Sequence, residues 1–199
     1  MTSSPQAAAY PGEPTPLAAL PWPPELPDGL PPYPRVLKLV DADTVSRGLV
    51  NGTPRERASN HEMRRCFDLV HATATAIDPH ARTRVAASSE TTTHHLDILT
   101  TAGNNCWTVA WGLDGADQVL LEELTSLIGA RTTAARPGRK RAARPADLVI
   151  LVGQDHCYAD DVRRLRLMGC PTWLLVPGYY VAASLYSAAT AVSFIGPRR

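Results

Sequence analysis

The chain has 199 residues, and its basic and acidic side chains almost cancel to a net charge of +1. This length suits one domain with a tail, and a hydrophobic content of 44% is enough for a buried core. The small net charge excludes a surface that is basic throughout. Any binding to nucleic acid or acidic lipid must therefore use a local patch.

The four cysteines are scattered singly along the chain, at Cys66, Cys106, Cys157 and Cys170. They match neither a zinc knuckle nor a CxxC redox pair, and this usage is typical of reduced thiols in a cytoplasm. The N-terminus lacks the basic and apolar regions of a signal peptide, and no apolar run is long enough to span a bilayer. We therefore expect a soluble, cytoplasmic protein with no membrane partner.

The first 34 residues differ in composition from the rest, because eleven of the eighteen prolines lie there. Proline removes backbone donors and disfavours helix interiors, so residues 1–34 are predicted to be disordered or in polyproline II conformation. Such a tail can bind an aromatic groove of a partner protein, and a plain solvated tail is the alternative. Residues 35–199 are expected to form the domain.

Strands and helices alternate through residues 35–199. Strands are expected at 36–40, 83–88, 106–111, 147–152, 172–176 and 191–195, and helices at 62–76, 92–101, 117–128, 158–168 and 182–189. Gly129 is expected to end the third of these helices, and a polar arm with Gly52 and Pro54 to follow the first strand. Short apolar strands joined by helices predict a three-layer α/β/α fold with a mostly parallel central sheet of five or six strands.

Aspartates follow three of the predicted strands. Asp41 and Asp43 come after the first strand, Asp114 and Asp117 after the third, and Asp155 after the fourth. The carboxyl ends of parallel strands share one edge of the sheet, which is where ligands bind in open α/β folds. Crowded carboxylates repel one another and favour a hard divalent cation. The alternative for each aspartate is helix capping or turn chemistry.

Three segments carry a resemblance to a known family: LVDADT at 39–44, DGAD at 114–117 and LVILVGQDHCY at 148–158. Their order and spacing resemble the NYN branch of the PIN-like nuclease superfamily, over nearly all of 35–196. The resemblance implies a central first strand beside the fourth, with the sheet order reversing between them. It also implies that Asp41 and Asp155 face each other there, with Asp117 beside them.

The family resemblance implies an endoribonuclease that uses Mg²⁺ or Mn²⁺ to cleave single-stranded RNA. Asp41, Asp117 and Asp155 would be the catalytic residues that hold the metal, with support from Asp43 and Asp114. The chain departs from the family at three positions, with Thr44 in place of Asn, Gln154 in place of Gly and Cys157 in place of a second Asp. The departures at Gln154 and Cys157 favour the alternative, a degenerate member that binds RNA or a protein without cleavage. An unrelated nucleotide binder is disfavoured, because no Gly-rich loop follows the first strand.

A basic segment precedes the fourth strand and is the candidate contact for nucleic acid phosphates. Its candidate phosphate-binding residues are Arg136, Arg139, Lys140, Arg141 and Arg144. The alternative is a solvated loop. The segment contains no aromatic residue, so we do not expect it to stack on bases.

Overall fold

The computed structural model describes residues 19–27, 30–50, 56–101, 107–112, 114–134 and 145–195. Within them, one six-stranded sheet has the order β3-β2-β1-β4-β5-β6, and all of its strand pairs are parallel. The strands are β1 (Val36–Asp41), β2 (Arg82–Ser88), β3 (Trp107–Ala110), β4 (Leu148–Val152), β5 (Thr172–Val176) and β6 (Ala191–Phe194). The mostly parallel sheet predicted from the sequence is thus parallel throughout its described strands.

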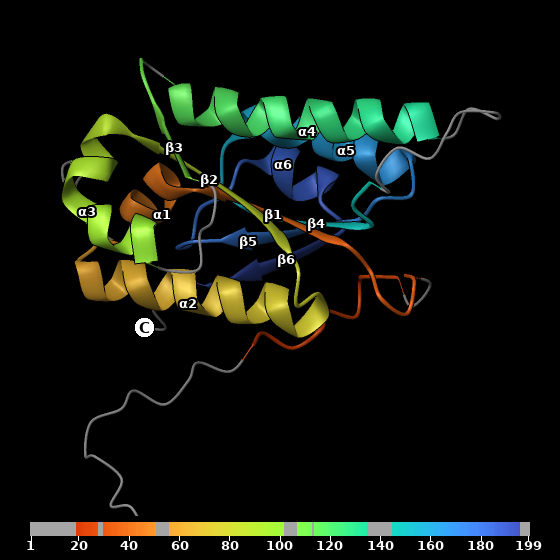
Figure 1. Ribbon diagram of the computed structural model, residues 1–199, viewed down its shortest axis with the longest axis horizontal. Coiled ribbons are helices and arrows are strands. Elements are labelled where there is room, and N and C mark those ends of the chain that lie inside the picture. Colours follow the sequence, from red (N-terminus) through yellow and green to blue (C-terminus); the bar gives the residue numbers. More distant parts are fainter. Residues whose placement is uncertain are drawn as a thin grey trace, which may run out of the picture.

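Helices cover both faces of the sheet (Figure 1). One layer holds α1 (Ala42–Gly48), α2 (Asn60–Ile77) and α3 (Ser89–Thr101), and the other holds α4 (Gly115–Ala134), α5 (Ala159–Leu167) and α6 (Ala183–Ala188). A short 3₁₀ turn, η1 (His156–Tyr158), precedes α5. The three-layer α/β/α architecture is confirmed. None of the helices in the described ranges has the length and apolar character needed to cross a membrane.

Strand β1 lies in the middle of the sheet and is buried along its whole length. Val36 and Val40 pack into the α2 layer, whereas Leu37 and Leu39 pack into the α4 layer, as the two-residue period of a strand requires. Lys38 interrupts this apolar pattern. Its side chain is only 1% exposed, and burial lowers the pKa of its amine to about 8.

The order of the sheet reverses between β1 and β4. Val40 of β1 lies level with Val85 of β2 on one side and with Val152 of β4 on the other. The crossovers from these two strands leave towards opposite layers, which opens a crevice at their carboxyl ends. The first strand is central and the fourth lies beside it, which is the arrangement that the family resemblance implies.

Two helices differ from the sequence-based expectation. The arm after β1 begins with α1, whose N-cap is Asp41. Helix α4 does not end at Gly129 but continues to Ala134. Glycine costs a helix about 1 kcal/mol relative to alanine. Beyond it, the Arg131 guanidinium donates to the carbonyls of Ala146 and Met168, and these bonds hold the last turn against the domain.

Where the structure describes the proline-rich tail, at residues 19–27 and 30–34, the chain packs on the domain. Leu26 is 2% exposed within the core cluster that includes Trp173, and the Trp22 ring meets the Trp173 ring edge-on at 6.3 Å. The Leu20 amide donates to the hydroxyl of Thr73 on α2. Apolar residues of this proline-rich segment therefore add to the core. Residues 1–18 lie outside the described ranges.

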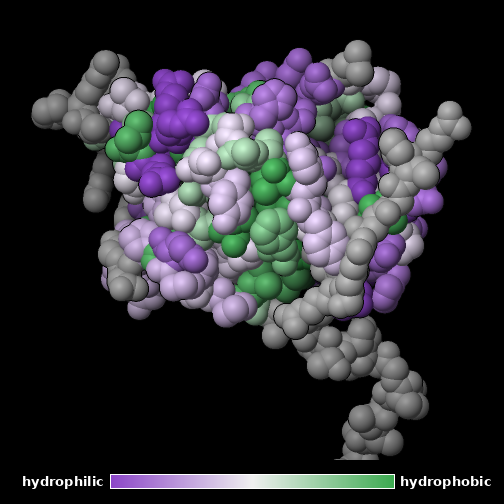
Figure 2. Space-filling model, turned by 180° about the vertical axis from the view of Figure 1, so that it is seen from behind, coloured by the Kyte–Doolittle hydropathy of each residue, from purple (hydrophilic) through white to green (hydrophobic). Residues whose placement is uncertain are grey.

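The back of the molecule carries a central band of hydrophobic residues between hydrophilic ones (Figure 2). Edge strands offer unpaired backbone groups, and β6 is one of the two edge strands among those described. Its last residue, Phe194, is 51% exposed.

Candidate functional site at the carboxyl edge of the sheet

Three aspartates meet at the crevice between β1 and β4. Asp41 ends β1, Asp117 lies in the first turn of α4, and Asp155 follows β4 as the N-cap of η1. In addition to burial, the charge of Asp117 raises the pKa of Asp41, the charge of Asp155 raises the pKa of Asp117, and the charges of all three raise the pKa of Cys157. The structure thus brings together the three residues that the sequence nominated.

Asp41 is the most perturbed carboxyl of the group. It is 3% exposed, and burial raises its pKa from 3.8 to about 7. Hydrogen bonds from the backbone amide and the hydroxyl of Thr44 act in the opposite direction, while the charges of Asp117 and Asp43 add to the rise. Asp41 also caps α1, so its capping role and its place in the site coexist.

Asp117 is held from the other side by a tyrosine. The hydroxyl of Tyr158, which is fully buried, donates a hydrogen bond to the Asp117 carboxylate. Burial raises the pKa of Asp117, the bond from Tyr158 lowers it, and the charges of Asp155, Asp114 and Asp43 raise it further. Sequence reasoning did not nominate Tyr158. The signal was its position three residues after Asp155, where a one-turn helix returns it to the crevice.

Asp43 and Asp114 lie near the three central aspartates, and their charges act on them. Asp43 accepts hydrogen bonds from the amide and hydroxyl of Ser88 at the end of β2, at 3.0 and 2.9 Å, which fixes α1 against that strand. Asp114 is exposed and has a positive φ of 58° in the turn that leads into α4. Its carbonyl accepts a hydrogen bond from the Gln118 amide at the start of α4. Its negative charge adds to the rise in the pKa of Asp117 that burial causes.

Asp155 is the most accessible of the three central carboxylates, with 45% of its side chain exposed. Its carboxylate accepts from the Cys157 amide at 3.4 Å and pairs with His156 Nδ1 at 2.6 Å. The Cys157 thiol is half-buried beside the cluster. Burial and the charges of the central aspartates raise the pKa of this thiol to about 12, so it stays protonated at neutral pH.

The donor set suits a hard divalent ion bound partly through water. All the candidate ligands are carboxylate oxygens, and none of the groups that shift the pKa of Asp41 or Asp117 is a basic side chain. In the described part of the chain, no three His, Cys, Asp or Glu side chains are arranged closely enough to hold an ion on their own. Mg²⁺ commonly uses only one or two carboxylates and completes its shell with water and substrate phosphate. The residues present fit that mode of binding.

The residues predicted to contact phosphates belong to the basic segment before β4. Arg136, Arg139, Lys140, Arg141 and Arg144 all lie outside the described residues.

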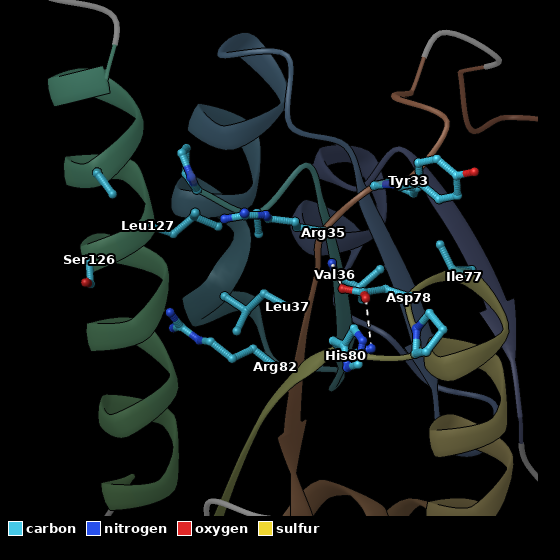
Figure 3. A pocket seen from close by; sticks show the side chains of 15 residues that line it. Tyr33, Arg35, Val36, Leu37, Ile77, Asp78, His80, Arg82, Ser126 and Leu127 are labelled. Carbon is cyan, nitrogen blue, oxygen red and sulfur yellow. Dashed lines mark hydrogen bonds between the residues drawn. The ribbon is translucent and has the colours of Figure 1, made fainter. Parts of the chain in front are cut away.

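A separate cavity of about 920 Å³ lies at the amino edge of the sheet (Figure 3). It runs between α4 and the end of α2 over the start of β1. Arg35 and Arg82 extend towards Leu127, while Tyr33 and His80 line the other side. Because β1 separates this cavity from Asp41, it does not belong to the carboxylate site.

The chain matches no protein-family model and no curated protein sequence. Among solved structures, it is similar to the crystal structure of a protein of unknown function from Vibrio parahaemolyticus, with a TM-score of 0.48 and 12% sequence identity. The similarity covers 83% of this chain and 95% of that chain. It is too low to assign a fold family or a function.

Proposed function

We propose that this protein is an endoribonuclease that hydrolyses RNA phosphodiester bonds with Mg²⁺ or Mn²⁺ at the crevice between β1 and β4. The observation that supports the proposal most is the clustering of Asp41, Asp117 and Asp155, which come from three separate elements, with no basic side chain among the groups that shift the pKa of Asp41 or Asp117. Such a cluster is costly unless a cation neutralises it. The resemblance to the NYN branch of PIN-like nucleases supports the same reaction, and scattered free thiols favour a cytoplasmic location.

The chain's own residues have separable roles in this proposal. Thr44 holds both oxygens of Asp41, and Tyr158 orients Asp117, so the two less exposed carboxylates are fixed before a ligand arrives. Asp155 is 45% exposed and would help to hold the divalent ion where a substrate phosphate can reach that ion. A bound divalent ion supplies an activated water and neutralises the charge that develops on the phosphoryl oxygens.

His156 is placed to move a proton. Its side chain is 80% exposed, and its Nδ1 atom pairs with the Asp155 carboxylate at 2.6 Å. An imidazole beside the carboxylates can serve as a general acid towards a leaving oxygen.

The second candidate function is RNA binding without cleavage. Cys157 favours it, because a neutral thiol occupies the position where the family pattern has a second carboxylate, and thiols are poor ligands for Mg²⁺.

Cleavage of a mixed single-stranded RNA pool tests the proposal. Wild-type protein should cut the pool with Mn²⁺ and not with EDTA, and Asp155→Asn should abolish cutting while the fold is retained. Asp68→Asn, an exposed carboxylate on α2, is the matched control and should cut normally. Binding without any metal-dependent cutting by the wild type would select the second candidate.

A further inference from the structure

Large aromatic side chains are exposed on two loops at the carboxyl edge of the sheet. Trp111, which directly follows β3, is 80% exposed, and Tyr179 and Tyr180, which follow β5, are 53% and 71% exposed. Single exposed aromatic residues are common on protein surfaces and need no explanation. Here, however, the two loops lie on opposite sides of the strands that carry the aspartates.

The Trp111 loop is tied to one side of the carboxylate site. A turn closed by the Gly115 amide and the Gly112 carbonyl leads from this loop through Asp114 into α4, which carries Asp117 in its first turn. In the sheet, β3 lies two strands from β1. Asp41 is level with Ala86 of β2 and, through it, with Thr108 of β3, so Trp111 lies about 10 Å to one side of Asp41 and three residues further towards the carboxyl edge.

The tyrosine loop is fixed at both ends to the other side of the site. At its start, Gly178 has a φ of 99° and packs so closely on Gly48 of α1 that a Cβ atom on either glycine would lie about 2 Å from a backbone oxygen. At its end, the Ala182 amide donates to the carbonyl of Gln154 at 3.0 Å, and Gln154 immediately precedes Asp155. Tyr179 and Tyr180 are thus carried on a segment that is anchored beside the catalytic candidates.

A basic side chain lies next to the tyrosine loop. Arg47 is exposed in the last turn of α1, directly before Gly48, and no carboxylate of the described residues pairs with it. Phosphates between stacked bases therefore have a donor available that the aspartates themselves cannot supply.

We propose that Trp111 on one side and Tyr179 with Tyr180 on the other are base-stacking platforms for single-stranded RNA, with Arg47 as a phosphate contact. This inference rests on the proposed function, because it identifies how the substrate lies across the same site. Stacking accepts any unpaired base, whereas the bases of a duplex are already stacked and unavailable. The site therefore prefers single strands and has little preference for sequence.

Binding without metal tests the platforms separately from cleavage. A fluorescein-labelled single-stranded RNA of about 12 nucleotides is titrated with the full chain in EDTA at low salt, and its anisotropy is recorded. Trp111→Ala and Tyr180→Ala should each weaken binding by about 5- to 100-fold, and Trp111→Phe and Tyr180→Phe should restore most of it. Tyr33→Ala is the matched control, since Tyr33 is an exposed aromatic residue at the opposite edge and its loss should leave the affinity unchanged.

The outcomes separate the two proposals. Loss of affinity in the two alanine variants supports the platforms whether or not Mn²⁺ produces cleavage. Cleavage that is unaffected in both variants supports the nuclease but overturns the platforms, as does the absence of RNA binding by the wild type in EDTA. Duplex RNA of the same sequence that competes as well as the single strand, or a DNA strand that binds more tightly than RNA, also overturns the inference.

Discussion

Replacing Asp41 by asparagine should stabilise the metal-free protein at alkaline pH and leave it unchanged in acid. Asparagine is a good N-cap of the same shape, so its oxygen still accepts from the Thr44 amide, while its NH2 group donates to the Thr44 hydroxyl, which must turn to accept. The change removes only the ability of this buried group to become charged. The comparison therefore isolates the cost of ionising Asp41.

The size of the effect follows from the pKa of Asp41, which burial raises from 3.8 to about 7. The folded protein thus binds this proton more tightly than the unfolded chain, and the resulting stability is present below pH 3.8 and is lost as pH rises to 7. A shift of this size corresponds to about 4 kcal/mol in the free energy of unfolding. Asp41→Asn should gain up to this amount at about pH 8 and close to nothing at about pH 4.

Urea denaturation in EDTA, followed by circular dichroism across this pH range, measures the gain directly. Asp68→Asn serves as the control, because Asp68 is exposed on α2 and its replacement should have a small effect at every pH. A loss of stability in Asp41→Asn at about pH 8, or the same difference from wild type at both ends of the range, would refute the reasoning. In that case Asp41 would be an ordinary helix cap.

Further predictions, each measured by urea denaturation, concern Leu26 in the tail, Tyr158 beside Asp117, and Gly48, which packs against the loop after β5. Leu26→Ala should cost about 2 to 3 kcal/mol, because it leaves a cavity in the core cluster; a tail that does not pack would give no change. Tyr158→Phe should cost about 1.5 to 3 kcal/mol above pH 7, and much less in an Asp117→Asn background, since the lost bond is to that carboxylate. Gly48→Ala should cost about 1 to 3 kcal/mol through its clash with the loop after β5, whereas Gly129→Ala, which meets no atom within 4 Å, should stabilise α4 by about 0.5 to 1 kcal/mol.

The sequence was sufficient for the layout of the site, because strand patterns and chain order decide it. The apolar run before Asp155 and the shorter run before Asp41 identify two buried strands, and parallel crossovers then place both aspartates at one edge.

What the sequence could not provide depends on tertiary contacts. The buried hydroxyl of Tyr158 reaches Asp117 across 41 residues, and Leu26 packs against a core formed by much later strands. Local composition favours a disordered tail, and only the complete sheet shows the surface that the tail covers. Exposed aromatic residues such as Trp111 and Tyr180 follow no periodic sequence pattern. Only the fold shows that both lie at the same edge of the sheet.

The central claim is that the carboxylates at the crevice form a divalent cation site, and the most direct test is the effect of Mn²⁺ on stability. An ion that binds only the folded protein at a hundred times its dissociation constant raises the free energy of unfolding by about 2.7 kcal/mol. We predict that millimolar Mn²⁺ raises the melting temperature of the wild type and of Asp68→Asn, but not of Asp117→Asn or Asp155→Asn. The account is contradicted if Mn²⁺ does not shift the wild type, or if it shifts all four proteins equally.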